Sequence, residues 1–216
     1  MKKKMVLVGV LLVAAIALVF SFSTKDKGID VSQYQGDINW EKVDVDFAMV
    51  RAGYRGADNG AIHIDTKFYQ NMDGAKEQGI KTGIYFFSTA VNVREAKEEA
   101  RTVVSLAKDY KPIYIAFDME SVHPGDRTEG LSVEQNTKNA LAFCKVVKRA
   151  GFKPLVYGNI NYFNNQVKLD KVDKYDIWLA DYTSHGEGDI KWDMLQYSCR
   201  GKVKGIKGKV DLNELR

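Results

Sequence analysis

The chain has few of the residues that build metal centres, disulfide frameworks and flexible linkers. Its 216 residues include only three histidines, two cysteines and three prolines. The histidines, His63, His123 and His185, stand alone in loop-like segments without the spacing of metal ligands, so we expect no metal site. Neither Cys144 nor Cys199 has a histidine near it in the sequence, which argues against catalysis by cysteine. No proline-rich or serine-rich linker divides the chain, which favours a single domain.

Nucleic-acid binding finds no support in the charge of the chain. Removing residues 1–23, which carry three lysines and no acid, lowers the net charge from +4 to +1. Binding to a phosphate backbone needs concentrated positive charge. Four lysines do cluster late in the chain, and we interpret them as part of a solvated loop, with contact to an anionic surface as the alternative: Lys202, Lys204, Lys207 and Lys209.

One long apolar run is present, close to the N-terminus. Three lysines precede an uninterrupted apolar segment at residues 5–20, and small serines suited to cleavage follow it. This pattern predicts that residues 1–23 are an export signal, or a membrane tether through residues 5–22 if cleavage fails. We therefore expect an exported monomer that is extracellular, in the cell wall, or on the outer face of the cytoplasmic membrane. Residues 24–216 are expected to form its single domain.

The two cysteines leave a structural alternative open. In an exported protein Cys144 and Cys199 can form a disulfide. Cys144 also lies at helical spacing with Leu141 and Val147, where a buried free thiol is equally reasonable.

Short β-branched or aromatic runs alternate with longer amphipathic segments along the chain. Eight strands are expected, at residues 28–32, 47–54, 82–88, 112–120, 154–158, 176–181, 194–197 and 210–212. Three long helices are expected at residues 65–77, 93–108 and 133–150, with a short one near 160–166. Ser132 and Gln135 predict a capping box for the third long helix, and Asp65 can cap the first. This order predicts an α/β fold, a TIM-like (β/α) barrel with about eight strands and fewer than eight helices.

The sharpest chemical signal lies in residues 112–121, which read P-I-Y-I-A-F-D-M-E-S. In a strand, successive side chains point to opposite faces, so Asp118 and Glu120 share one face while Phe117 and Met119 lie on the other. Like charge and partial burial are expected to raise the pKa of one carboxyl group and leave the other ionised, which suits acid and base chemistry. The alternative is that both acids are solvated loop residues or helix caps.

Acids and aromatic residues recur where the expected strands end. In barrels of this type the functional groups gather at that rim. Aromatic faces pack on sugar rings while carboxyl groups act on a glycosidic bond, so we expect a carbohydrate ligand. Filling of the barrel is the alternative for the aromatic residues Tyr54, Tyr85, Tyr157, Trp178, Tyr182 and Tyr197. The chain has no phosphate-binding loop or dinucleotide fingerprint, and we expect no cofactor.

An ordered series of motifs is similar to a known family. The series includes G-I-D-V-S-Q-Y-Q-G at residues 28–36, I-N-W at 38–40, F-A-M-V-R-A-G-Y at 47–54 and D-T-K-F-Y-Q-N-M-D-G-A-K-E-Q-G at 65–79. G-I-Y-F-F-S, A-F-D-M-E-S, W-L-A-D-Y and V-D-L-N follow in the same order. Over residues 28–213 the chain resembles the glycoside hydrolase family 25 lysozymes, also called Chalaropsis-type N-acetylmuramidases.

This resemblance implies a flattened, irregular barrel that acts on bacterial peptidoglycan. The implied reaction is hydrolysis of the β-1,4 bond between N-acetylmuramic acid and N-acetylglucosamine. By position, Glu120 matches the general acid and base, and Asp30, Asp118 and Asp211 match the supporting acids. Residues that the resemblance or the rim position assigns to substrate binding are Asp181, Tyr182, Trp178, Tyr54, Tyr85, Tyr157 and Tyr197.

The residues suggest a mechanism and leave two rival functions open. In this hypothesis Glu120, with a raised pKa, protonates the leaving sugar oxygen while Asp118 stays ionised and orients either the substrate's N-acetyl group or a water. One rival is a hydrolase of chitin-type N-acetylglucosamine polymers. The other is a barrel that binds cell-wall glycans without cutting them.

Overall fold

The computed structural model describes residues 25–120 and 125–216. The expected leader at residues 1–23 and His123 lie outside these ranges. Among the helices within them, none is long and apolar enough to span a membrane.

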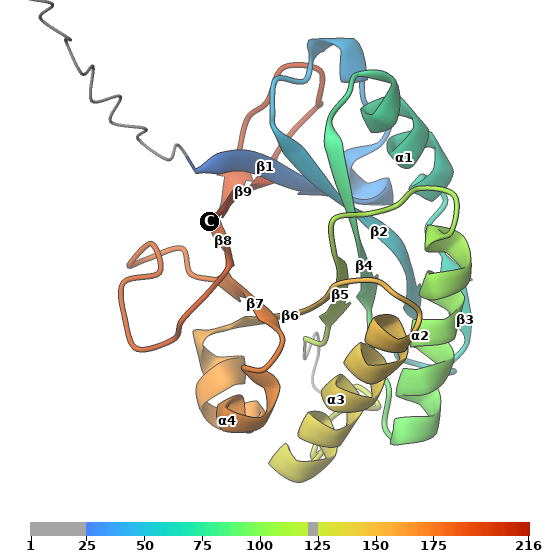
Figure 1. Cartoon of the computed structure of the whole chain (residues 1–216), viewed down its shortest axis with the longest axis vertical. Coiled ribbons are helices and arrows are strands. Elements are labelled where there is room, and N and C mark those ends of the chain that lie inside the picture. The colour runs from blue at the N-terminus through green and yellow to red at the C-terminus, as the bar shows by residue number, and fades with distance from the viewer. Residues whose placement is uncertain (1–24, 121–124) are drawn as a thin grey trace, which may run out of the picture.

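Eight strands close into a barrel, and a short ninth strand extends the sheet at one edge (Figure 1). The barrel strands are β1 (Asp26–Val31), β2 (Phe47–Arg55), β4 (Lys81–Phe87), β5 (Ile115–Asp118), β6 (Pro154–Asn159), β7 (Asp176–Ala180), β8 (Met194–Gly201) and β9 (Val210–Leu215). The extra strand, β3 (Ile62–Ile64), pairs with the end of β2 and was not predicted. Pairing of β1 with both β2 and β9 closes the ring, so the predicted TIM-like barrel is confirmed.

The last strand runs against its neighbours. Seven strands of the barrel are parallel, whereas β9 is antiparallel to both β8 and β1. An antiparallel strand starts at the rim where the parallel strands end. Asp211, in the strand expected at residues 210–212, therefore lies near the start of β9 at the same rim. There it is the register partner of Asp30, near the end of β1.

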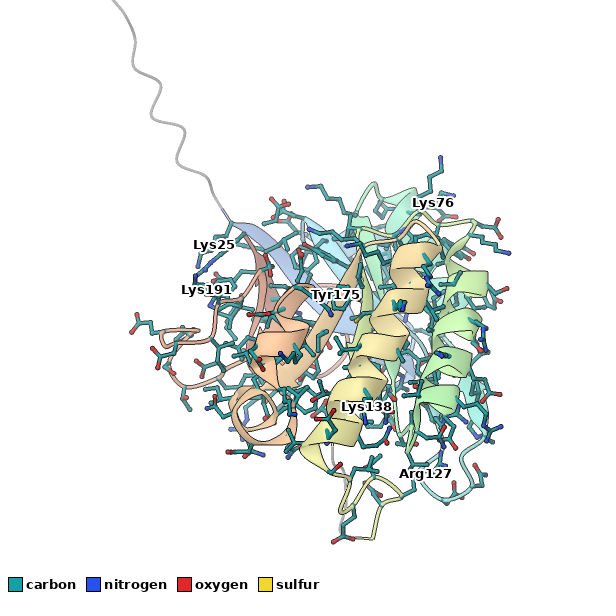
Figure 2. All side chains as sticks on the ribbon, turned by 60° about the horizontal axis from the view of Figure 1, so that its bottom comes forward. Lys25, Lys76, Arg127, Lys138, Tyr175 and Lys191 are labelled. Carbon is teal, nitrogen blue, oxygen red and sulfur yellow. The ribbon has the colours of Figure 1, made fainter. Side chains whose placement is uncertain are left out.

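The long helices cover only part of the barrel. These are α1 (Phe68–Glu77), α2 (Val93–Ala107) and α3 (Val133–Arg149), and a single turn, α4 (Leu169–Val172), follows β6. Figure 1 shows α1, α2 and α3 on one side of the ring, whereas none of the α-helices in the described residues covers β8, β9 and β1. In Figure 2, α2 and α3 lie side by side, with charged side chains such as Lys138 pointing outward. This uneven cover makes the barrel irregular, as expected.

The predicted helix caps form only in part. The Ser132 hydroxyl accepts a hydrogen bond from the Gln135 backbone N–H (3.1 Å), but the Gln135 side chain donates to Asn139 instead of completing the capping box. The first helix begins at Phe68, because the Asp65 carboxylate accepts from the Lys67 backbone N–H and forms a turn before the helix. Both cysteines are free: Cys144 is buried and Cys199 is exposed.

Two apolar cores lie on opposite faces of the barrel wall. Ile115, Phe117 and Met119 belong to the outer core, between the strands and the helices. Tyr114 and Ala116 point inside, which confirms the predicted alternation along β5. The inner core is rich in large side chains: Phe47, Met49, Tyr85, Leu155, Tyr157, Trp178 and Met194. These residues fill the barrel and form the floor beneath its C-terminal rim.

Candidate active site

An open cavity of about 280 Å³ lies at the C-terminal end of the barrel. Four carboxyl groups line it, from Asp30 on β1, Asp118 at the end of β5, Glu120 just after β5, and Asp211 on β9. The structure thus brings together acids that are up to 181 residues apart in the sequence. The inner core seals the cavity from below.

Asp30 is the most firmly held of these acids. It is 6% exposed, and its Oδ2 atom accepts hydrogen bonds from the amide groups of Gln196 and Asn213, both at 2.8 Å. Burial first, and then the charge of Asp211, raise the pKa of Asp30 well above its usual range, while the two amides offset part of the shift. Burial also raises the pKa of half-buried Asp211, and its contact with Asp30 offsets part of that shift. The two aspartates therefore compete for protons.

Asp118 and Glu120 form a second pair of interacting carboxyl groups. Asp118 is 4% exposed, and its buried Oδ1 atom has no hydrogen-bond partner. Burial, followed by the charges of Glu120 and Asp30, raises the pKa of Asp118 well above its usual range. Burial and the charge of Asp211 raise the pKa of Glu120, whereas its contact with Asp118 lowers it.

Asp118 and Glu120 titrate as a pair, and burial is the first cause that raises the pKa of each. The charged form is harder to stabilise on Asp118 than on Glu120 in the described residues. The physical reason is that Asp118 is the more deeply buried of the two and has no donor at Oδ1 to stabilise its charge.

Aromatic side chains orient the amides that hold Asp30. The Tyr157 and Tyr182 hydroxyls both donate to Gln196 Oε1, at 3.0 and 2.5 Å. The Trp178 indole N–H donates to Asn213 Oδ1 at 2.8 Å. Each amide oxygen is thereby occupied, which turns the amide NH₂ group toward Asp30 and fixes its orientation.

Comparison with known proteins identifies the family. The model of the family described as "Glycosyl hydrolases family 25" matches residues 29–206, from the second half of β1 through β8, and β9 follows the matched range. The chain belongs to glycosyl hydrolase family 25.

Curated relatives and solved structures agree with this family. The autolytic lysozyme of Clostridium acetobutylicum is 30% identical over 190 residues, a match that covers 87% of this chain and 55% of the relative. The modular autolysin LytC of Streptococcus pneumoniae, solved in complex with a synthetic peptidoglycan ligand, superposes with a TM-score of 0.78 at 26% identity, covering 89% of this chain and 47% of that one. The bacterial lysozyme from Streptomyces coelicolor gives a TM-score of 0.74 at 25% identity, covering 90% and 93%. The chain thus spans about half the length of the first two proteins.

Most of the aromatic residues expected at the site do lie there. Tyr85, Tyr157, Trp178 and Tyr182 line the cavity of this family 25 protein. Tyr182 is 47% exposed and is open to a ligand, whereas Trp178 is 1% exposed and mainly fills the barrel. Tyr54 lines a second, adjoining cavity instead.

Asp181 has a different position from the one that we expected. Its side chain is buried and does not line the cavity. The carboxylate accepts hydrogen bonds from the backbone N–H groups of Thr183, Ser184 and Gly186 and from the Thr183 and Ser184 hydroxyls, all within 3.1 Å. Burial raises the pKa of Asp181, but these donors outweigh it and hold the pKa well below its usual range. Asp181 therefore organises the loop after β7, and we withdraw its assignment to substrate binding.

Tyr197 is also misassigned by the sequence prediction. The pairing of β8 with β9 shifts register between Gln196 and Ser198, and Tyr197 packs against the outer core with its ring centroid 6.2 Å from that of His185. Gln196 takes the inward position at the site. Strand alternation could have indicated Gln196 instead of Tyr197. Gln196 lies on the same face of β8 as Met194, and Asn213 lies on the same face of β9 as Asp211.

Proposed function

We propose that the protein is a lysozyme that hydrolyses the β-1,4 bond between N-acetylmuramic acid and N-acetylglucosamine in bacterial peptidoglycan. The observation that carries this proposal is the group of four carboxyl groups around one cavity in a family 25 barrel. The peptidoglycan ligand of the related autolysin and the lysozyme names of the relatives support the choice of substrate.

In this proposal Glu120 is the general acid and base. It lines the cavity and is partly exposed, so it can reach the oxygen of a glycosidic bond. Its raised pKa favours the protonated form that a general acid needs. Glu120 gives this proton to the leaving oxygen and later takes one from the water that completes hydrolysis.

Substrate binding favours a proton on Glu120. The N–H of a substrate N-acetyl group can donate to Asp118 Oδ1, the atom that has no partner in the free protein. Such a hydrogen bond stabilises the charged form of Asp118 and lowers its pKa, so that the pair holds its proton on Glu120. The oriented acetamido oxygen then attacks the anomeric carbon as the bond to the leaving oxygen breaks, which predicts retention of configuration.

Asp30 and Asp211 supply negative charge beside the reacting sugar. Asp211 raises the pKa of Glu120, and the pair stabilises positive charge that develops at the anomeric carbon. The Gln196 and Asn213 amides hold Asp30 in position for this role.

The proposed site of action is the cell wall outside the cytoplasmic membrane. The wall-degrading relatives support an exported protein, with residues 1–23 as its signal or residues 5–22 as its tether. We propose that the barrel acts as a monomer, because one chain supplies all four acids of the cavity.

Digestion of purified peptidoglycan tests the function. The products are reduced with borohydride and analysed by mass spectrometry, and we expect muramitol at the new reducing ends. Glucosaminitol ends, or release from chitin at a rate similar to that from peptidoglycan, would indicate a different hydrolase. Retention of the polymer without new reducing ends would indicate a binding barrel. Proton NMR of the first-formed product is expected to show the β-anomer, and an α-anomer would contradict assistance by the acetamido group.

A further inference from the structure

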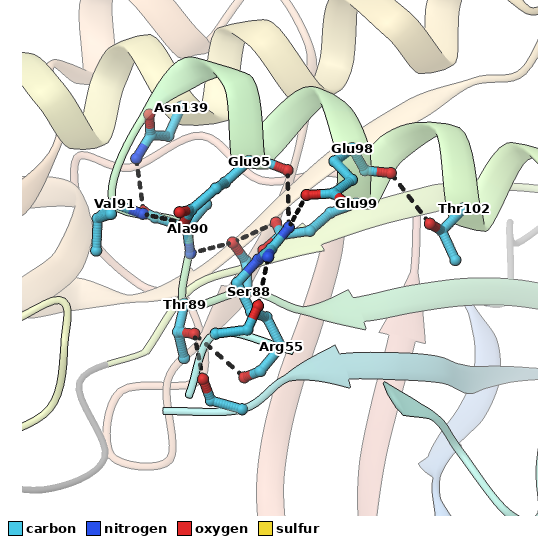
Figure 3. Close-up of polar contacts among 12 residues, drawn as sticks. Arg55, Ser88, Thr89, Ala90, Val91, Glu95, Glu98, Glu99, Thr102 and Asn139 are labelled. Atoms are coloured by element: carbon cyan, nitrogen blue, oxygen red, sulfur yellow. Dashed lines mark hydrogen bonds and ion pairs between the residues drawn. The ribbon is translucent and has the colours of Figure 1, made fainter. Parts of the chain in front are cut away.

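Two buried arginines on β2 differ in how completely their guanidinium groups are bonded. Arg55 is 5% exposed and Arg51 is 7% exposed. Arg55 donates from all three nitrogens, to Glu99 and Glu98 carboxylates and to the Gly60 and Glu95 carbonyl groups (Figure 3). Arg51 donates from Nε to Asp65 at 2.7 Å, but its buried Nη2 has no hydrogen-bond partner. A buried donor without a partner is unfavourable unless a ligand occupies it.

Arg51 is held rigidly at the junction of two cavities. Its guanidinium carbon lies 4.9 Å from the ring centre of Tyr34 and 5.4 Å from that of Tyr54. Arg51, Tyr34, Phe87 and Glu120 line both the catalytic cavity and a second cavity of about 770 Å³. The second cavity therefore opens directly beside the proposed general acid.

The second cavity has an aromatic wall beside this guanidinium group. Tyr54 stacks on His63 with ring centroids 5.0 Å apart, and Tyr34 is 79% exposed. The guanidinium group that carries the unpaired Nη2 lies beside the Tyr34 and Tyr54 rings. A guanidinium group matches the planar oxygens of a carboxylate or a carbonyl group. The cavity thus suits a ligand substituent that carries a carboxylate or a carbonyl group close to Arg51.

Two groups on the proposed substrate supply a carbonyl or carboxyl-derived oxygen beside the sugar ring, the acetamido group of both sugars and the lactyl group of N-acetylmuramic acid. N-acetylmuramic acid and N-acetylglucosamine share their ring hydroxyl and acetamido chemistry, and they differ in the 3-O-lactyl group of the former. We propose that Arg51 binds the carboxyl-derived oxygen of this lactyl group and that the second cavity accommodates the substituent. This inference rests on the proposed function and assigns to Arg51 the discrimination between the two sugars.

Sugar binding to a protein that cannot turn over tests the proposal. In a Glu120→Gln background, the dissociation constants of N-acetylmuramic acid and N-acetylglucosamine are measured by NMR titration with and without Arg51→Gln. A hydrogen bond to a charged group is worth about ten- to a hundredfold in affinity. We expect N-acetylmuramic acid to bind more tightly by about this factor, and Arg51→Gln to remove the difference without weakening N-acetylglucosamine. Arg101→Gln, on the exposed surface of α2, is the matched control.

Other outcomes contradict the proposal in distinct ways. Equal weakening of both sugars would assign Arg51 to the shared acetamido or hydroxyl groups. No difference between the sugars before substitution, including no binding of either one, would overturn the proposal. Arg51→Lys keeps the charge beside Asp65 if Arg51→Gln does not fold, and it is expected to lose most of the discrimination because it lacks the planar fork. If the wild type releases no muramitol ends from peptidoglycan, the proposed function fails instead, whatever the binding result.

Discussion

Two sets of buried acids lie near each other at the C-terminal end of the barrel, one represented by Glu99 and the other by Asp118, and they differ in their surroundings. Glu99 on α2 is wholly buried, and its two oxygens accept from Arg55 Nε at 2.7 Å and from the Ser88 hydroxyl at 2.6 Å (Figure 3). Asp118 faces a cavity and has an oxygen without a partner. The two sets lie at adjacent strands, because Ser88, which binds Glu99, follows β4 and its backbone N–H donates to the Asp118 carbonyl group at the end of β5.

This comparison shows that burial and a raised pKa do not identify an active site by themselves. Burial raises the pKa of Glu99 from its ordinary value of 4.5 to about 7, although Ser88 and Arg55 favour its charged form. Glu99 nevertheless lines neither cavity at the rim. The acids that suit chemistry are those that face a cavity and have an oxygen without a hydrogen-bond partner. We therefore assign Glu99 to stability and the cavity acids to the reaction.

The largest difference between the two groups is expected in catalysis. Glu120→Gln keeps the shape of the side chain but removes the transferable proton, so we expect kcat on peptidoglycan to fall by about a thousandfold. Release of reducing ends measures this loss, and circular dichroism checks that the fold is intact. Glu187→Gln, an exposed residue in the loop after β7, is the control and is expected to match the wild type. Near-normal activity of Glu120→Gln would refute its role as general acid.

The structural role of Glu99 predicts a large loss of stability. Glu99→Ala removes the partner of buried Arg55, and we expect the free energy of unfolding to fall by about 3–5 kcal/mol. Urea denaturation measures this change. Glu98→Ala serves as the control, because its side chain also contacts Arg55 but is 56% exposed, so a loss of less than about 1 kcal/mol is expected. Similar losses for both variants would show that Glu99 has no special structural role.

The pKa of Glu99 also predicts how stability depends on pH. A carboxyl group whose pKa is raised in the folded state adds stability below its unfolded pKa, and this stability is lost as the pH rises through the folded pKa. For Glu99 the window runs from 4.5 to about 7, a change of about 3 kcal/mol. Urea denaturation at several pH values in this range measures the free energy of unfolding. We expect this free energy to fall less with rising pH for Glu99→Gln than for the wild type. Parallel curves for the two proteins would contradict the raised pKa.

The sequence predicted most of the fold because the local patterns agree with the final structure. Alternation along residues 112–120 correctly placed Phe117 and Met119 in one core and Asp118 with Glu120 at the rim. The antiparallel direction of β9 could not be predicted, because residues 202–209 form a hairpin whose geometry depends on contacts such as Asn39 N–H to the Gly205 carbonyl group.

The errors at the site have a common physical cause. Asp181 and Tyr197 were chosen for their chemistry and rim position, but hydrogen bonds within a loop and a register shift turned their side chains away from the cavity. Gln196, Asn213 and Arg51 were missed as functional residues because their roles arise from contacts between strands that are distant in the sequence. Strand alternation indicates the face on which Gln196 and Asn213 lie, but no local pattern shows these contacts.

The central claim is that the cavity acids are kept for chemistry at the expense of stability, and Asp118→Asn tests it most directly. Because the pKa of Asp118 is raised in the folded state, a neutral residue should stabilise the protein at pH 7 by about 0.5–2 kcal/mol. The gain should disappear well below pH 3.8, where the wild-type carboxyl group is protonated in both the folded and the unfolded state. Asp44→Asn, at an exposed position, is the control and should change neither property. Thermal unfolding and reducing-end release on the same samples should show a higher Tm with lower activity for Asp118→Asn. A lower Tm at pH 7, or unchanged activity, would contradict the account.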